Sequence, residues 1–182
     1  IVPDQAGAWF NLGNALTGQG KWQEASDAFD KAVRLEPGLI DAYINWGDAL
    51  SRAGRHDAAL DVLRLGLSLS PAHPGLLSNT GNILLNLHQI KEALPFLENA
   101  VKAMPNSPVA IRNLANGHRL SGKPALALTI LEPLIRRDPN DANARCIRAF
   151  AFFSLGNYGK AWPDYTMRWH TAQHEAARPF KQ

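Results

Sequence analysis

Residues 6–39 read AGAWFNLGNALTGQGKWQEASDAFDKAVRLEPGL, and this stretch decides the fold. Its first half is apolar on one helical face, at Trp9, Leu12, Gly13 and Leu16. Its second half is apolar on the face of another helix, at Ala25, Phe29 and Ala32. Gly20 supplies a turn between the halves, and Pro37 ends the second helix because a proline there cannot continue it. The stretch therefore predicts two antiparallel helices.

The same pattern returns every 34 residues. Full copies cover residues 6–39, 40–73, 74–107 and 108–141, and a weaker fifth copy covers residues 142–173. One position is alanine in every copy, at Ala25, Ala59, Ala93, Ala127 and Ala161. Proline recurs at the same spacing, at Pro3, Pro37, Pro71, Pro105 and Pro139, but the fifth copy has Gln173 at this position. Because one helix pair cannot bury its apolar face alone, we expect the copies to stack.

Small residues mark two further positions of the repeat. One follows the apolar face of each first helix, at Gly13, Gly47, Gly81, Ala115 and Ala149. Without large side chains there, the two helices of a pair can approach closely. The turn position is glycine at Gly20, Gly54, Gly122 and Gly156, with His88 as the exception.

The combined pattern closely resembles the tetratricopeptide repeat signature, and the segment 8–16, AWFNLGNAL, is close to its consensus opening. The resemblance covers residues 1 to about 170. It implies an all-α fold, a right-handed solenoid of stacked antiparallel helix pairs that forms a superhelix and binds proteins. Residues 1–5 then read as the end of a preceding repeat, and residues 174–182 as a linker to a downstream domain.

Composition excludes several other classes of protein. The chain is 46% hydrophobic and 19% charged, and no apolar run approaches the roughly 18 residues that a membrane span needs. The net charge of +3 is small and spread, which argues against nucleic acid as a partner. The single Cys146 rules out an internal disulfide and fits a reducing compartment, so we expect a cytoplasmic protein that is not inserted into a membrane.

No set of residues in the sequence predicts catalysis. Cys146 has no histidine near it in the sequence, and Asp27 and Asp30 lie on the solvated face of a second helix. His170 and His174 are four residues apart and could hold a metal on a helix, but no third ligand is obvious nearby. We therefore expect a protein without a cofactor or metal that binds a partner rather than an enzyme.

The functional signal is a ladder of asparagines in the first helices. One position of the ladder is occupied by Asn11, Asn45, Asn79 and Asn113. The other, three residues later, is occupied by Asn14, Asp48, Asn82 and Asn116. The sequence holds 13 asparagines, and seven of them fill these eight positions in the middle of helices, where asparagine is a mediocre helix former. A role beyond local stability is therefore indicated.

Geometry suggests what the ladder binds. Residues at i and i+3 share a helix face, and stacking aligns these faces on the inner surface of the solenoid. An asparagine offers a donor and an acceptor together, as a peptide backbone does. Rungs about 10 Å apart match about three residues of an extended chain. We predict that the ladder binds an extended peptide or partner by its backbone, with selectivity added by Arg52, Arg112 and Arg119.

The ladder has a second interpretation. The asparagines could bridge adjacent first helices and only order the stack, and both roles can coexist. The ladder also resembles that of the superhelix of O-linked N-acetylglucosamine transferases, where asparagines at this position bind the substrate backbone. Ile147 and Phe150 replace both positions in the fifth copy, so a polar clamp would stop before it.

The end of the chain leaves two more hypotheses open. Four residues resemble the junction between tetratricopeptide repeats and the glycosyltransferase domain of bacterial proteins, namely Trp162, Tyr165, Arg168 and Trp169. The resemblance implies a substrate-recruiting arm whose sugar-nucleotide site lies after Gln182; the alternative is a capping helix with aromatic anchors. A third hypothesis is self-association, because an array that exposes an apolar end at each terminus can stack head to tail.

Overall fold

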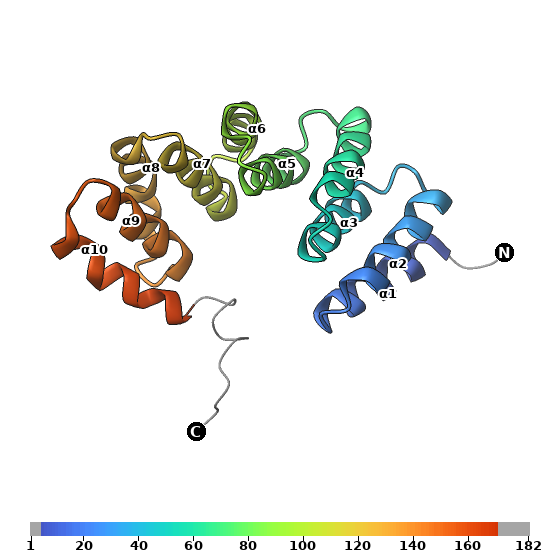
Figure 1. Cartoon of the computed structure of the whole chain (residues 1–182). Coiled ribbons are helices and arrows are strands. Elements are labelled where there is room, and N and C mark those ends of the chain that lie inside the picture. Colours follow the sequence, from blue (N-terminus) through green and yellow to red (C-terminus); the bar gives the residue numbers. More distant parts are fainter. Residues whose placement is uncertain (1–4, 171–182) are drawn as a thin grey trace, which may run out of the picture. The chain divides into compact units, whose positions relative to one another are not determined.

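The computed structural model describes residues 5–170, and in this part of the chain the regular secondary structure is all helical (Figure 1). The helices are α1 (Gln5–Gly18), α2 (Trp22–Leu35), α3 (Ile40–Arg52), α4 (His56–Leu69), α5 (Pro74–Asn86), α6 (Ile90–Ala103), α7 (Pro108–Leu120), α8 (Pro124–Arg137), α9 (Ala142–Ser154), α10 (Tyr158–Tyr165) and the 3₁₀ helix η1 (Thr166–His170). The two helices of each repeat pack together, as the 34-residue period predicts, so the all-α fold of helix pairs is confirmed.

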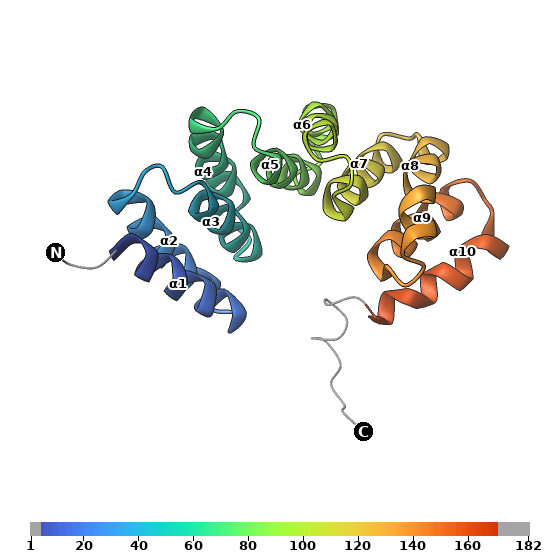
Figure 2. The same ribbon diagram turned by 180° about the vertical axis from the view of Figure 1, so that it is seen from behind.

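The chain divides into two compact units, Ile1–Ala103 and Met104–Gln182. We call them the N-terminal unit, whose described part holds α1–α6, and the C-terminal unit, whose described part holds α7–α10 and η1. Figure 2 shows the successive pairs α1–α2 and α3–α4 of the N-terminal unit and the pairs α7–α8 and α9–α10 of the C-terminal unit.

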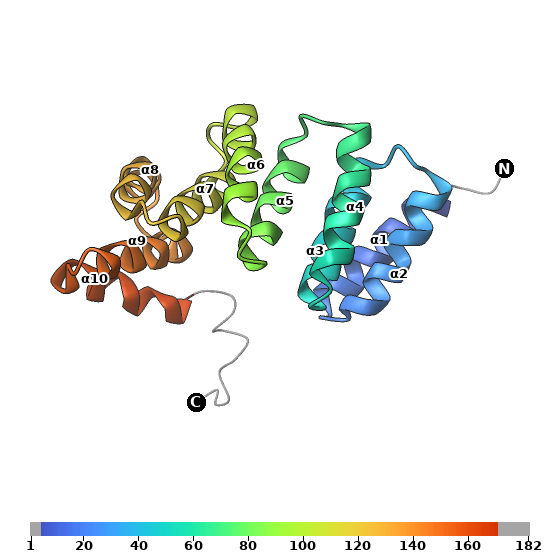
Figure 3. The same ribbon diagram turned by 45° about the horizontal axis from the view of Figure 1, so that its top comes forward.

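Within each unit the first helices of the pairs form one face. In the N-terminal unit α1 contacts α3, and α3 contacts α5, whereas α2, α4 and α6 do not contact one another (Figure 3). α2 lies against α1 and α3, and α4 lies against α3 and α5. In the C-terminal unit α7 likewise contacts α9. The first helices, which carry the asparagine positions, are therefore direct neighbours within each unit.

Small residues allow the helices of a pair to cross closely. A Cβ atom added at Gly13 would lie 2.5 Å from a ring carbon of the fully buried Phe29. At Gly81 it would lie 2.5 Å from a methyl carbon of Leu97. Any side chain at these two positions would require Phe29 or Leu97 to shift, which confirms the reason for the small residue.

The turns within all five pairs share one conformation. The backbone has a positive φ at Gly20 (73°), Gly54 (77°), Gly122 (78°) and Gly156 (71°), and also at His88 (59°). In the first turn, the Lys21 amide donates to the Leu16 carbonyl at 3.0 Å and the Gly20 amide donates to the Thr17 carbonyl at 3.0 Å. These two bonds define a Schellman cap, which needs a left-handed residue and therefore favours glycine. His88 adopts the same conformation despite its Cβ.

Candidate functional site

In the N-terminal unit, asparagines connect neighbouring first helices. The Nδ2 atom of Asn45 on α3 donates to Oδ1 of Asn14 on α1 at 2.8 Å. Nδ2 of Asn79 on α5 donates to the backbone carbonyl of Ile44 on α3 at 3.4 Å. Both hydrogen bonds run from one repeat to the previous one. The structure thus contains the bridging contacts of the stack-ordering interpretation.

The bridges use only part of the hydrogen-bonding capacity of these amides. A primary amide has two donor hydrogens and an acceptor oxygen with two lone pairs. Asn45 uses one of its two donor hydrogens in the hydrogen bond to the previous repeat, and so does Asn79. Asn11 and Asn14 are exposed on α1. The amides can therefore order the stack and still bind a further group.

A small polar pocket lies between α3 and α5. It is lined by Asp48, Ser51, Asn79, Asn82 and Ile83, and its volume is about 20 Å³. That volume is enough for a water molecule or a single hydrogen-bonding group. Within residues 5–170 the amide of Asn82 makes no hydrogen bond to another side chain or to the backbone, although the side chain is half-buried. Three ladder residues from two repeats thus meet in one pocket.

Arg52 contacts one residue of this pocket, Asp48. Its Nε atom donates to Oδ2 of Asp48 at 2.7 Å, one helical turn earlier. Its guanidinium lies over the ring of Trp22, 5.1 Å from the centroid. The contact with Trp22 comes from the previous repeat, and repeat spacing alone did not predict it. Arg52 therefore neutralises Asp48 while remaining exposed to solvent.

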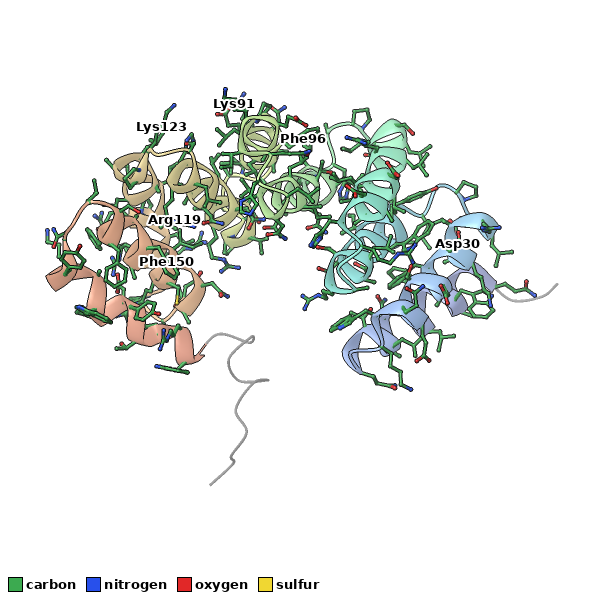
Figure 4. All side chains as sticks on the ribbon, in the orientation of Figure 1. Asp30, Lys91, Phe96, Arg119, Lys123 and Phe150 are labelled. Atoms are coloured by element: carbon green, nitrogen blue, oxygen red, sulfur yellow. The ribbon has the colours of Figure 1, made fainter. Side chains whose placement is uncertain are left out.

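The C-terminal unit arranges its ladder residues differently. Oδ1 of Asn116 accepts hydrogen bonds from Nε and from a terminal nitrogen of Arg119, at 3.1 Å and 2.8 Å. The Arg119 guanidinium lies over the ring of Phe150, 5.5 Å from the centroid, and the two side chains are neighbours in Figure 4. Burial lowers the pKa of Arg119 from its ordinary value, because a buried site disfavours the charged form. Asn113 lies one turn away, half-buried on α7.

Arg112 joins two helix pairs. One of its terminal nitrogens donates to Oδ2 of Asp141 at 2.6 Å, and both side chains are largely buried. Oδ1 of Asp141 accepts from the Ala144 amide at 2.9 Å and so caps α9. The sequence suggested Arg112 as a selectivity residue, and the structure gives it a contact that orders the stack.

The end of the C-terminal unit holds a buried charge cluster that the repeat pattern did not predict. Asp164 is almost fully buried and accepts from Arg145 Nε at 2.8 Å and from Arg148 Nε at 2.5 Å. Burial alone opposes the charged carboxylate, but hydrogen bonds from Arg148 and Arg145 outweigh it and hold the pKa of Asp164 below its ordinary value. The bond to Asp164 in turn raises the pKa of Arg148.

Aromatic side chains of α9 and α10 pack against one another in the same unit. Trp162 and Tyr165 meet edge to face with their centroids 5.6 Å apart, and Phe153 packs against both. Arg168 lies over Tyr165 at 4.2 Å and over Trp169 at 4.3 Å. The residues that resemble a glycosyltransferase junction therefore anchor α10 and η1 to α9, as a capping helix would.

No arrangement for catalysis or metal binding is found in residues 5–170. No group of three His, Cys, Asp or Glu side chains there could hold a metal ion. His170 and His174, whose spacing suggested a possible metal site, lie outside the residues whose side chains are described. Burial and the nearby Asp164 raise the pKa of the Cys146 thiol, which keeps it protonated rather than nucleophilic. Within the same range, no helix is long and apolar enough to cross a membrane.

Known proteins resemble this chain along most of its length. Models of the tetratricopeptide repeat match residues 6–39, 40–73 and 84–149. No curated protein matches it. Among solved structures, TTC0263, a thermophilic tetratricopeptide repeat protein in Thermus thermophilus, has a TM-score of 0.80 at 17% identity over 94% of both chains. MamA from Desulfovibrio magneticus RS-1 has a TM-score of 0.75 at 22% identity, over 99% of this chain and 100% of that chain.

A third structure is described as one with an unusual peptide-binding site. It is YrrB, with a TM-score of 0.65 at 22% identity, over 94% of this chain and 91% of that chain. At these identities the solved structures support the fold alone, whereas the repeat models match the sequence itself. Nothing in these comparisons points to catalysis. The chain belongs to the tetratricopeptide repeat family, whose fold is generally a scaffold for protein–protein interaction.

Proposed function

We propose that this chain binds an extended peptide segment of a partner protein along its first helices, through the asparagine ladder. The pocket between α3 and α5 carries the proposal, since it gathers Asp48, Asn79 and Asn82 from two neighbouring repeats. The half-buried amide of Asn82 makes no hydrogen bond within residues 5–170, so its donors and acceptor are available to a bound group.

The chemistry of the pocket favours a backbone over a charged side chain. Asp48 is already neutralised by Arg52, at 2.7 Å, so a cation gains little there. The remaining groups are the hydroxyl of Ser51 and the amides of Asn79 and Asn82, which are neutral donors and acceptors. A peptide group offers one donor and one acceptor and matches them without regard to sequence.

The test begins with a probe that assumes no partner. Peptides would be selected from a random display library on the immobilised chain. A selected peptide would then be labelled with a fluorophore, and its affinity would be measured by fluorescence anisotropy. Replacement of Asn79 and Asn82 by alanine should weaken binding on the order of tenfold or more, because each net hydrogen bond contributes about 1 kcal/mol. The single variants Asn45→Ala and Asn113→Ala should weaken it less.

The matched control is Asn99→Ala, which removes the same amide from an exposed position on α6, outside the ladder. It should leave the affinity unchanged. Equal binding by wild type and by the Asn79→Ala, Asn82→Ala double variant, with circular dichroism intact, would show that the ladder is not the binding site. Failure to select any peptide would also contradict the proposal.

A second candidate is a substrate-recruiting arm of a glycosyltransferase. The observation in its favour is the set Trp162, Tyr165, Arg168 and Trp169, which resembles the junction before such a domain. The natural coding sequence beyond Gln182 tests it. A nucleotide-sugar transferase domain there would support this candidate, and any other continuation would remove it.

A further inference from the structure

The pocket between α3 and α5 has a counterpart in the C-terminal unit. The pocket is lined by residues of two neighbouring first helices, namely Asp48, Ser51, Asn79, Asn82 and Ile83. Two repeats later, the same positions are filled by residues of α7 and α9, namely Asn116, Arg119, Ile147, Phe150 and Ala151. A cation and an aromatic ring therefore stand where the pocket has a hydroxyl group and an amide. We call Asn116, Arg119 and Phe150 the arginine site.

The guanidinium of the arginine site is held on one edge and on one face. Asn116 Oδ1 accepts from Arg119 Nε at 3.1 Å and from Nη2 at 2.8 Å, which occupies the edge of the guanidinium that these two nitrogens form. The ring of Phe150 covers one face, 5.5 Å from the guanidinium carbon, and the two labelled side chains are neighbours in Figure 4. Phe150 in turn meets Tyr165 edge to face at 5.8 Å. The cation is therefore positioned without a ligand.

Arg119 keeps donors that no group in residues 5–170 uses. A guanidinium has five N–H donors, and Asn116 takes two of them. The remaining three, two on Nη1 and one on Nη2, include the edge that the two terminal nitrogens form. Within the same range Arg119 makes no ion pair, although the side chain is half-buried. Burial of a charge without a counter-ion is unfavourable, so an anion is favoured at this edge.

The other arginines suggested for selectivity do not share this property. Arg52 is paired with Asp48 at 2.7 Å, and Arg112 is paired with Asp141 at 2.6 Å. On α9, Arg145 and Arg148 are both bound to Asp164. Among the arginines of α7 and α9, only Arg119 therefore lacks a carboxylate within residues 5–170.

The charge of the C-terminal unit also favours an anionic ligand. Its sequence holds 11 Lys and Arg against 5 Asp and Glu, whereas that of the N-terminal unit holds 8 against 11. A net positive charge raises the local concentration of anions and speeds their association. The unit that contains the arginine site is therefore the one that attracts acidic groups.

We propose that the arginine site binds the carboxylate of an acidic side chain in a segment of a partner protein. The two terminal nitrogens can donate in parallel to the two oxygens of a carboxylate, which is the geometry of a strong arginine–carboxylate pair. One negative charge also matches the single uncompensated cation, whereas a phosphorylated side chain carries nearly two. The inference rests on the proposed function for its ligand, a partner segment, and adds the residue type that this segment carries.

The test uses the full chain and peptides selected on it from the random display library. The selected peptides should share an aspartate or glutamate. Replacing that residue by its amide should weaken binding to the wild type about tenfold or more, because hydrogen bonds to charged groups exceed neutral ones. Arg119→Gln should weaken binding of the acidic peptide by a similar factor. With both changes made together the loss should be no larger than with either alone, since the two groups act on each other.

The matched control is Arg136→Gln, which removes the same charge from an exposed position on α8 of the same unit. It should leave the affinity of the acidic peptide nearly unchanged, so a general effect of net charge is separated from the arginine site. If Arg119→Gln loses helicity by circular dichroism, Arg119→Lys takes its place. Lysine keeps the charge but lacks the planar fork, so it should still weaken binding of the acidic peptide several-fold; an unchanged affinity would overturn the proposal.

The possible failures are distinguishable. Selected peptides without a shared acidic residue overturn the arginine site, and so do effects of the peptide change and of Arg119→Gln that simply add. Either result leaves the asparagine ladder standing if the Asn79→Ala, Asn82→Ala double variant weakens binding. Conversely, an acidic peptide that depends on Arg119 but not on Asn79 and Asn82 supports the arginine site and contradicts the ladder.

Discussion

The two units join their helices with different polar chemistry. In residues 5–103 the side-chain hydrogen bonds between pairs are accepted by neutral groups, as in Asn45 with Asn14, Trp46 with Ser26 and Arg55 with Gln23. The ion pairs found there all lie within one helix, at Asp30–Arg34, Asp48–Arg52 and Asp61–Arg64. In residues 104–170 the links between helices are ionic and largely buried, at Arg112–Asp141, Arg145–Asp164 and Arg148–Asp164.

This difference distinguishes two roles of polar side chains in a repeat, binding a partner and fixing neighbouring helices. Neutral amides hold neighbouring repeats together while keeping spare donors and acceptors, so the N-terminal unit can both stack and bind. Buried ion pairs depend on every partner being present, because removing one leaves an unpaired charge. The C-terminal unit therefore uses its polar side chains mainly to fix its last helices.

The largest expected effect comes from removing the shared carboxylate of the C-terminal unit. Asp164→Ala leaves Arg145 and Arg148 without their common partner and should lower the free energy of unfolding by about 3–5 kcal/mol. The matched change in the N-terminal unit is Asp30→Ala, which breaks an exposed pair with Arg34 and should cost less than about 1 kcal/mol. Urea unfolding followed by circular dichroism measures both. Equal losses of unfolding free energy in the two variants would contradict the proposed difference between the units.

Acid should affect the C-terminal unit through the same carboxylate. The pKa of Asp164 is lower in the folded chain than its ordinary value, so the unfolded state takes up a proton first as the pH falls. The stability from the cluster is therefore complete above about pH 4, the ordinary range for aspartate, and is lost as the pH falls through the folded pKa. The stability difference between wild type and Asp164→Asn should shrink over that interval. A constant difference from neutral pH to acid would contradict this.

A smaller effect is expected at the close helix crossing of the N-terminal unit. Gly13→Ala places a methyl group 2.5 Å from the buried ring of Phe29 and should cost about 1–3 kcal/mol. Gly18→Ala, in the same helix, meets no atom within 4 Å and should instead gain up to about 1 kcal/mol from helix propensity. Thermal melts of the two variants should shift in opposite directions, and a shift of the same sign would refute the packing argument.

The smallest effect concerns the one turn without glycine. His88→Gly removes a Cβ from a left-handed residue with φ of 59° and should stabilise the N-terminal unit by about 1 kcal/mol. Gly54→Ala introduces the same strain at φ of 77° and should destabilise it by a similar amount. The midpoints of chemical unfolding compare the two, and a loss of stability in His88→Gly would mean that its side chain makes a compensating contact.

The helices and turns could be predicted because each repeat encodes them locally. Apolar spacing, the glycine between the helices and the small residue at Gly13 all act within about 34 residues and recur. His88, the exception at the turn position, takes the same backbone conformation as the four glycines, which the sequence did not predict.

The polar contacts between helices could not be predicted in this way. Arg145 and Arg148 find Asp164 across 19 and 16 residues, in a copy where the pattern has decayed. Arg112, which we expect to add selectivity, reaches Asp141, 29 residues away, because stacking brings the next first helix beside it. Such pairs depend on where extended side chains meet once the repeats have stacked. The 34-residue period of the sequence does not specify these contacts.

The central claim is that the first helices of the N-terminal unit bind a peptide by its backbone. It is tested most directly by methylating, one at a time, the backbone nitrogens of a selected peptide and measuring each affinity for the chain. We predict losses of about fivefold or more at positions spaced about three residues apart, since each methyl group removes one hydrogen bond to a rung. Alanine substitution of the peptide side chains should matter less. The account would be contradicted if backbone methylation left the affinity unchanged while removal of peptide side chains strongly lowered it.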